Sequence, residues 1–101
     1  MTKTLQSAAT TGNGSAGSVE DRGTVYVVGA GTISGGTVVI EEAHSEDYSG
    51  TWSSLQTITA SALTGGAVQA IHVSGFYRAV RARISSTITG GGTISATLEG
   101  I

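Results

Sequence analysis

The clearest alternation of apolar and polar residues in the chain lies at residues 76–85. Successive side chains of an extended strand point to opposite faces, so this segment has two unlike faces. One face has an apolar row made of Val80, Ala82 and Ile84, with Arg78 at its start. The other face has Tyr77, Ala79, Arg81 and Arg83. We predict a strand that packs on a core through the apolar row, with Arg81 and Arg83 pointing outward and Arg78 at the solvent end of that row.

Short runs rich in β-branched and aromatic residues recur along the rest of the chain. Such runs are typical of strands, and glycine-rich turns separate them here. They lie at residues 24–28, 37–43, 51–59, 67–73 and 93–100. With no convincing helix, six to eight short strands predict an all-β fold, which is either an antiparallel β-sandwich or a jelly-roll-like barrel.

Residues 51–59 allow a second interpretation, because Trp52, Leu55 and Ile58 have the three-residue spacing of a helix face. The serines and threonines between them are poor helix formers, so we favour a strand with a bulge. Trp52 is the only tryptophan and has two possible roles. It is either the largest residue of the core or, with Tyr48, an exposed aromatic surface for a sugar or a partner.

The chain has the length of a single domain, and its first 23 residues differ in texture from the rest. A short β-compatible start is followed by a run of small polar residues at positions 10–18. Such a run buries too little apolar surface to offset its ordering entropy. We therefore expect residues 1–23 to be a flexible or partner-ordered N-terminal arm, and residues 24–101 to form the β-sandwich domain.

Charge and composition narrow the function classes. A formal net charge of −2 and a pI near 5.5 give no basic field for phosphate neutralisation, so nucleic acid is not an expected partner. The chain has no cysteine, which rules out disulfides and thiolate metal sites. No segment has the length of a membrane helix, and the N-terminal residues lack the apolar core of a signal peptide, so we expect a soluble protein made in the cytoplasm.

No constellation of residues predicts catalysis or cofactor binding. His44 lies near Glu42, Glu46 and Asp47, but these residues have no metal-ligand spacing, and a solvated loop is the favoured interpretation. The glycine clusters match neither phosphate-binding fingerprint and precede no helix, so tight hairpins are expected. We therefore predict a protein that is not an enzyme and that uses no cofactor or metal.

The outward side chains of residues 76–85 are the strongest candidates for a contact surface. Arginine and tyrosine are enriched at protein interfaces, which favours Tyr77, Arg81 and Arg83 as partner contacts. An equally good interpretation is a solvated outer face on which the arginines pair with Glu41 or Glu99 across neighbouring strands.

Residues 36–41, 48–55, 77–84 and 92–98, taken in this order, resemble small β-sandwich proteins of tailed-bacteriophage virions. In that pattern a strand with a glutamate leads into a Gly-Thr-Trp turn, and a Tyr-Arg strand precedes a glycine hairpin and the last strand. The same order is faintly similar to discoidin-like, galactose-binding sandwiches.

The phage resemblance implies a structural role in the virion. It implies a capsid decoration, cement or head-fibre protein, whose partner is the major capsid protein or another virion protein and which works as a homo-oligomer, with a trimer expected. The alternative is a carbohydrate- or receptor-binding module of a phage tail or fibre, for which Trp52 and Tyr48 are the candidate contacts.

Overall fold

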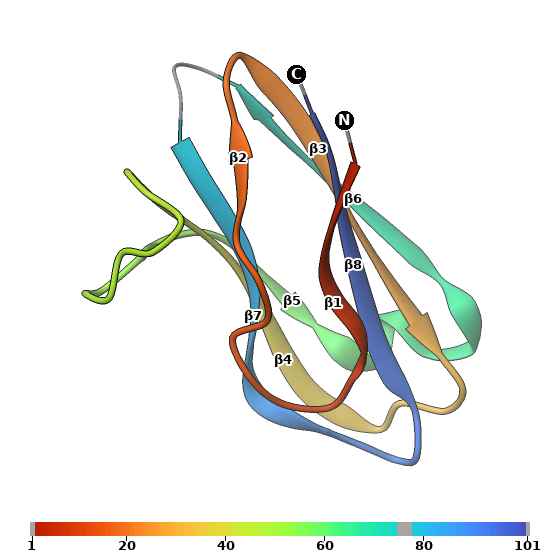
Figure 1. The fold of residues 1–101 in the computed structure, drawn as a ribbon. Coiled ribbons are helices and arrows are strands. Elements are labelled where there is room, and N and C mark those ends of the chain that lie inside the picture. The colour runs from red at the N-terminus through yellow and green to blue at the C-terminus, as the bar shows by residue number, and fades with distance from the viewer. Residues whose placement is uncertain (1, 75–77, 101) are drawn as a thin grey trace.

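The computed structural model describes residues 2–74 and 78–100, shown as a ribbon in Figure 1. Within these residues the chain forms eight β-strands and one short 3-10 helix. The elements are β1 (Thr2–Ala9), β2 (Gly17–Val19), β3 (Arg22–Ala30), β4 (Gly35–Ala43), β5 (Ser53–Thr59), η1 (Ala60–Gly66), β6 (Val68–Ser74), β7 (Arg78–Thr89) and β8 (Thr93–Gly100).

The strands build two antiparallel four-stranded sheets that pack face to face. One sheet has the order β1-β8-β3-β6 and is called the β8 sheet below. The other has the order β2-β7-β4-β5 and is called the β7 sheet. The predicted antiparallel β-sandwich is therefore confirmed, in the form of two separate sheets. Both ends of the described chain lie at the same end of the sandwich (Figure 1).

The core lies between the sheets and follows the alternation of the sequence. In β7 and β8 alternate apolar side chains point inward, and six of them are no more than 6% exposed. These are Val80, Ala82 and Ile84 of β7 and Ile94, Ala96 and Leu98 of β8. Full burial of one large aliphatic side chain is worth about 1.5–3 kcal/mol, so these rows are a main source of stability.

The connection between β5 and β6 is a 3-10 helix that contributes to the core. Ala60 and Leu63 of η1 are buried, and Leu63 packs closely against β3. A Cβ atom added at Gly29 would overlap the carbonyl oxygen of Leu63. The absence of a side chain at Gly29 is therefore what allows η1 to lie against β3.

The N-terminal residues differ from the expected arm. β1 pairs with β8 and β2 pairs with β7, so residues 2–19 add a strand to each sheet. Leu5 and Val19 are fully buried in the core. For the described residues, the expectation of an arm that ends at residue 23 was therefore wrong, and Met1 lies outside them.

Backbone hydrogen bonds explain why a run of small polar residues is ordered. The N–H of Ile84 donates to the carbonyl of Gly12, and the N–H of Ile88 donates to the carbonyl of Thr10, both at 2.9 Å. The buried side-chain amide of Gln6 donates to the carbonyls of Gly12 (3.0 Å) and Ala82 (2.8 Å). These bonds offset the ordering entropy that apolar burial could not offset.

Candidate functional site

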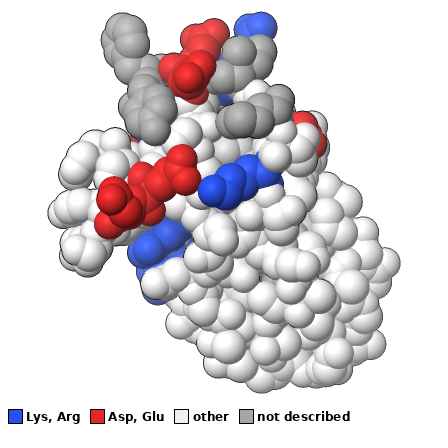
Figure 2. Space-filling view, in the orientation of Figure 1, with Lys and Arg blue, Asp and Glu red and all other residues white. Residues whose placement is uncertain are grey.

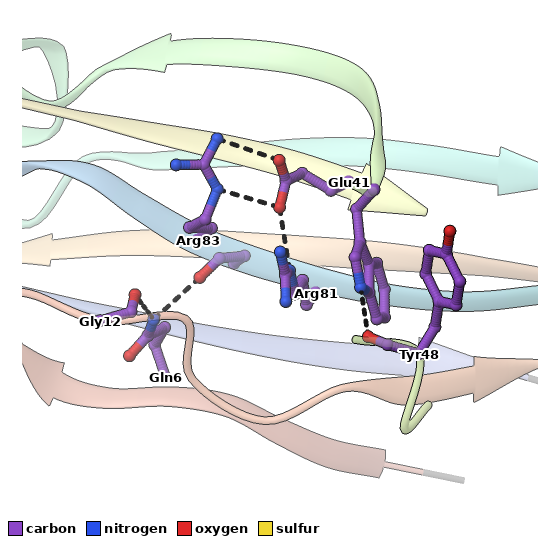
Figure 3. Close-up of polar contacts among 8 residues, drawn as sticks. Gln6, Gly12, Glu41, Tyr48, Arg81 and Arg83 are labelled. Atoms are coloured by element: carbon purple, nitrogen blue, oxygen red, sulfur yellow. Dashed lines mark hydrogen bonds and ion pairs between the residues drawn. The ribbon is translucent and has the colours of Figure 1, made fainter. Parts of the chain in front are cut away.

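The outer face of the β7 sheet carries an ion-pair cluster around Glu41. Antiparallel pairing places Glu41 of β4 directly opposite Arg81 of β7, and Arg83 lies two residues further along the same face. The Nε of Arg81 donates to Glu41 Oε1 at 2.9 Å. Arg83 binds both oxygens of the carboxylate, with Nε to Oε1 at 3.1 Å and Nη2 to Oε2 at 3.0 Å (Figure 3). Glu41 is therefore held by two guanidinium groups.

This cluster is largely shielded from water although it lies outside the core between the sheets. The side chain of Glu41 is 6% exposed, whereas those of Arg81 and Arg83 are 17% and 34% exposed. Burial of the carboxyl raises its pKa, but the hydrogen bonds from Arg83 and Arg81 outweigh burial, so the pKa of Glu41 lies below its usual value. Glu41 is ionised at neutral pH and is not poised to donate or accept a proton.

Trp52 covers this cluster. The Cζ atom of Arg81 lies 4.3 Å from the centroid of the indole ring, within the range of a cation–π contact. The indole N–H donates to the carbonyl of Tyr48 at 2.9 Å (Figure 3). Trp52 is buried, yet it does not belong to the core cluster between the sheets. It is therefore neither the central core residue nor an exposed aromatic platform.

Glu46 holds the loop between β4 and β5 against the N-terminal strands of the sandwich. This carboxylate accepts a hydrogen bond from the hydroxyl of Ser18 in β2, and the Nζ of Lys3 lies 3.3 Å from it. The Ser18 hydrogen bond is the main cause that lowers the pKa of Glu46, with a further contribution from Lys3. Tyr48, in the same loop, is partly exposed and its ring contacts that of His44.

The structure brings together three of the five predicted contact residues. Arg81, Arg83 and Trp52 share one cluster, and Tyr48 joins it through its backbone carbonyl rather than its ring. Tyr77 lies outside the described residues. The cross-strand pairing of the arginines with Glu41 is observed, and the Glu41 carboxylate is buried rather than solvated. The interpretation of Arg81 and Arg83 as partner contacts stays a prediction.

Arg78 lies where the alternation predicted, at the end of the apolar row of β7. It forms an ion pair with Glu42 of β4, and both side chains are about one quarter exposed. Sequence reasoning missed the roles of Lys3 and Ser18, which fasten the loop, and of Gln6. The only available signal for these was a polar residue in a β-compatible segment, which is too common to be informative.

The described part of the chain has no metal-binding cluster and no unpaired buried polar side chain. Residues 2–74 and 78–100 contain no group of three or more His, Asp or Glu side chains that could hold a metal ion. In the same residues every buried side-chain nitrogen and oxygen has a hydrogen-bond partner. The polar groups of the cluster are thus used to hold one another, which is the arrangement of a structural element.

One end of the sandwich has no charged residues in its turns. None of the five basic and seven acidic residues lies in the turns that join β1 to β2, β3 to β4, β5 to β6 and β7 to β8. These turns lie together, and we call them the uncharged end; they are residues 10–16, 31–34, 60–67 and 90–92. Hydrogen bonds from Gly65 N to Gly31 O and from Ser34 N to Thr89 O join the β3–β4 turn to the β5–β6 turn and to the end of β7. The bond from Ile88 N to Thr10 O joins the β1–β2 turn to β7. Figure 2 shows the charges gathered toward the opposite end, and a broad uncharged area below them.

The turns of the uncharged end consist mostly of small residues, so few large side chains cover their backbone. Gly90 and Gly91 have φ values of 103° and 95°, which side-chain-bearing residues rarely adopt, so the β7–β8 hairpin requires them. Most residues of the four turns are exposed threonine, serine, alanine or glycine. This end therefore presents exposed peptide groups and hydroxyls without ionic groups.

No helix in the described residues is long and apolar enough to cross a membrane. The chain matches no protein-family model, and no curated protein is significantly similar to it in sequence.

Proposed function

We propose that this chain is a non-enzymatic structural protein of a virion, a capsid decoration or cement protein that binds the capsid surface through its uncharged end. The observation that carries the proposal is the segregation of charge. Four adjoining turns carry no ionic group, whereas all twelve charged side chains lie elsewhere. A protein with two such different ends is suited to attach by one and to face water with the other.

The chemistry of the uncharged end suits attachment to another protein. Charged residues are depleted at the centres of protein interfaces because their desolvation is costly. Exposed peptide groups and hydroxyls form hydrogen bonds to a partner without that cost. Charged residues at the opposite end keep copies of the protein soluble and apart before they bind.

The buried cluster of Glu41, Arg81 and Arg83 supports a structural role rather than a reaction. Each of these groups has an internal partner, and the indole of Trp52 is stacked on Arg81. Since Trp52 is only 6% exposed, it does not offer the free aromatic face on which a sugar would stack. The carbohydrate-binding alternative thus loses one of the two residues that motivated it, whereas Tyr48 remains exposed.

Co-sedimentation with purified capsids that lack the protein tests this proposal. We expect the wild-type chain to bind, and Ala62→Glu, which places a charge on an exposed position of η1, to weaken binding at least tenfold. Ser49→Glu adds the same charge to the exposed loop after β4 and should leave binding unchanged. Failure of the wild-type chain to sediment with capsids would contradict the proposal, and equal loss in both variants would contradict the assignment of the end.

A further inference from the structure

A sandwich of two open sheets has four edge strands, and three of them are interrupted here. The pairing of β1 with β8 contains two register shifts, and β5 has a shift opposite Ile40 and Glu41. β2 is only three residues long. Bulges and short strands are the usual means by which proteins prevent the pairing of sheet edges.

β6 is the exception. It pairs with β3 over seven consecutive residues, from Val68 to Ser74, with no register shift. Among the described strands β3 is its only neighbour, and Figure 1 shows β6 at the margin of the sheet. Within the described strand there is no charged residue, no proline and no bulge, so these three devices that protect an edge strand are not used in β6.

The hydrogen-bonding pattern identifies the backbone groups that point away from the sheet. The N–H of Gly29 donates to the carbonyl of Ala67 at 3.2 Å, so this pair lies in the hydrogen-bonded position of the antiparallel ladder. Because hydrogen-bonded pairs alternate along such a ladder, Gln69, Ile71 and Val73 also face β3. The N–H and C=O groups of Val68, Ala70, His72 and Ser74 therefore point to the open edge.

An apolar surface adjoins this edge on the outer face of the β8 sheet. Val68 is 58% exposed and Tyr26 is 39% exposed, and these are two of the four large hydrophobic side chains exposed in the described residues. Tyr26 lies opposite Ala70 in the ladder, and Val28 lies opposite Val68. The open edge and the exposed apolar side chains thus form one continuous surface.

We propose that two copies of this chain pair through their β6 edges, in antiparallel orientation, to form a continuous eight-stranded sheet. The occupant is a second copy because such an edge is self-complementary: it offers the same seven residues, in the same regular register, to its twofold mate. No charge on β6 opposes this contact. The pairing is isologous and yields a dimer, in contrast to the trimer expected from the sequence. It does not rest on the proposed function.

The contact is small, which sets its strength. A seven-residue strand is about 24 Å long, and an interface of one strand pair with its flanking side chains belongs to the low end of specific interfaces, below about 1,200 Å². Such contacts are weak and transient. We therefore expect dissociation constants in the micromolar to millimolar range, at which the pairing becomes complete only when many copies are held close together.

Sedimentation equilibrium of the full chain between about 10 μM and 1 mM tests this inference. The wild-type protein should shift from monomer to dimer over this range. Ala70→Lys places a charge on an exposed position of the edge and should weaken the dimer at least tenfold. Thr57→Lys, which adds the same charge to an exposed position of edge strand β5, should leave it unchanged.

Ala70→Pro provides a second variant that distinguishes edge pairing from contact by side chains alone. It removes an N–H that points to the open edge and leaves the β3–β6 ladder bonds in place, so it should also abolish the dimer. Circular dichroism checks that each variant is folded. A wild-type chain that stays monomeric at 1 mM would overturn the proposal, as would a dimer that Thr57→Lys disrupts and Ala70→Lys does not.

Discussion

Arg81 and Trp52 are stacked, with the Cζ atom of the arginine 4.3 Å from the centroid of the indole ring. The same arginine donates to Glu41 on its other side. One guanidinium group therefore links the outer face of the β7 sheet to the loop that follows β4. In the sequence, the outward arginines of β7 are candidate partner contacts. In this structure, Arg81 of that strand also holds the loop after β4 in place.

Replacing Arg81 with alanine should destabilise the protein by about 2–3 kcal/mol. Removal of one partner from a buried ion pair typically costs about 3–5 kcal/mol, and here Arg83 still pairs with Glu41, which reduces the cost. Chemical denaturation measures the loss. The fluorescence emission of Trp52 should shift to longer wavelength, because the indole ring becomes more exposed to water without the Arg81 side chain.

Arg22→Ala is the matched control, since Arg22 lies exposed at the start of β3. It should change the free energy of unfolding by no more than about 0.5 kcal/mol. Equal effects of the two substitutions would show that the cluster around Glu41 contributes no more than a surface charge does.

Stability should fall in acid because the pKa of Glu41 is lowered in the folded protein. Burial raises this pKa, but the hydrogen bonds from Arg83 and Arg81 outweigh it. The unfolded chain then binds the proton more readily, so the stabilisation is present above the usual value near 4.5 and is lost as pH falls through the lower folded value.

Unfolding free energies measured from pH 7 to pH 3 test this dependence. Glu41→Gln should lower stability at pH 7 and flatten the curve below pH 4.5. Glu20→Gln, which removes the same charge from an exposed turn, should leave the slope intact. An unchanged slope in Glu41→Gln would assign the acid sensitivity to other carboxylates, of which Glu46 is the first to examine.

Gln6→Leu should loosen the N-terminal strands while leaving the rest of the sandwich folded. The substitution removes the donor for the carbonyls of Gly12 and Ala82, at a cost of about 1–3 kcal/mol for the unpaired groups. Hydrogen exchange should show faster exchange of the Ile84 amide, which donates to Gly12. The exposed neighbour substitution Ser7→Ala should not change that rate; unaltered protection in Gln6→Leu would contradict the role given to this side chain.

Gly29→Ala should be poorly tolerated although alanine is otherwise acceptable in strands. The new Cβ would overlap the Leu63 carbonyl, so η1 must move away from β3 at a cost of about 1–3 kcal/mol. Gly100→Ala is the matched control, because the nearest atom to its added Cβ is at 3.7 Å, an ordinary contact. Thermal unfolding that ranks the two substitutions equally would argue against close packing of η1.

Much of the fold follows from sequence because alternation specifies which face of a strand is buried. Val80, Ala82 and Ile84, and likewise Ile94, Ala96 and Leu98, lie in the core as their parity predicts. The N-terminal residues were mispredicted because their order depends on carbonyls that accept bonds from β7. Backbone partners leave no trace in composition, so a polar run looks mobile whether or not such partners exist.

The candidate site was only partly predictable. The alternation of side chains along the strand placed Arg81 and Arg83 on the same outward face, and Glu41 was a possible partner across neighbouring strands. The sequence did not show that the three side chains would be partly or fully buried. That burial depends on the loop after β4, which returns Trp52 onto Arg81. The position of a loop depends on a few long-range contacts, such as those of Glu46 with Lys3 and Ser18, which no local pattern encodes.

The proposed function requires that a virus encode this chain, so quantitative mass spectrometry of the purified particles of that virus tests the central proposal most directly. The quantity to measure is the number of copies of this chain relative to the major capsid protein. A decoration or cement protein predicts hundreds of copies per particle, in a fixed ratio to the capsid protein. Absence of the chain from purified particles, or only a handful of copies, would contradict a role on the capsid surface.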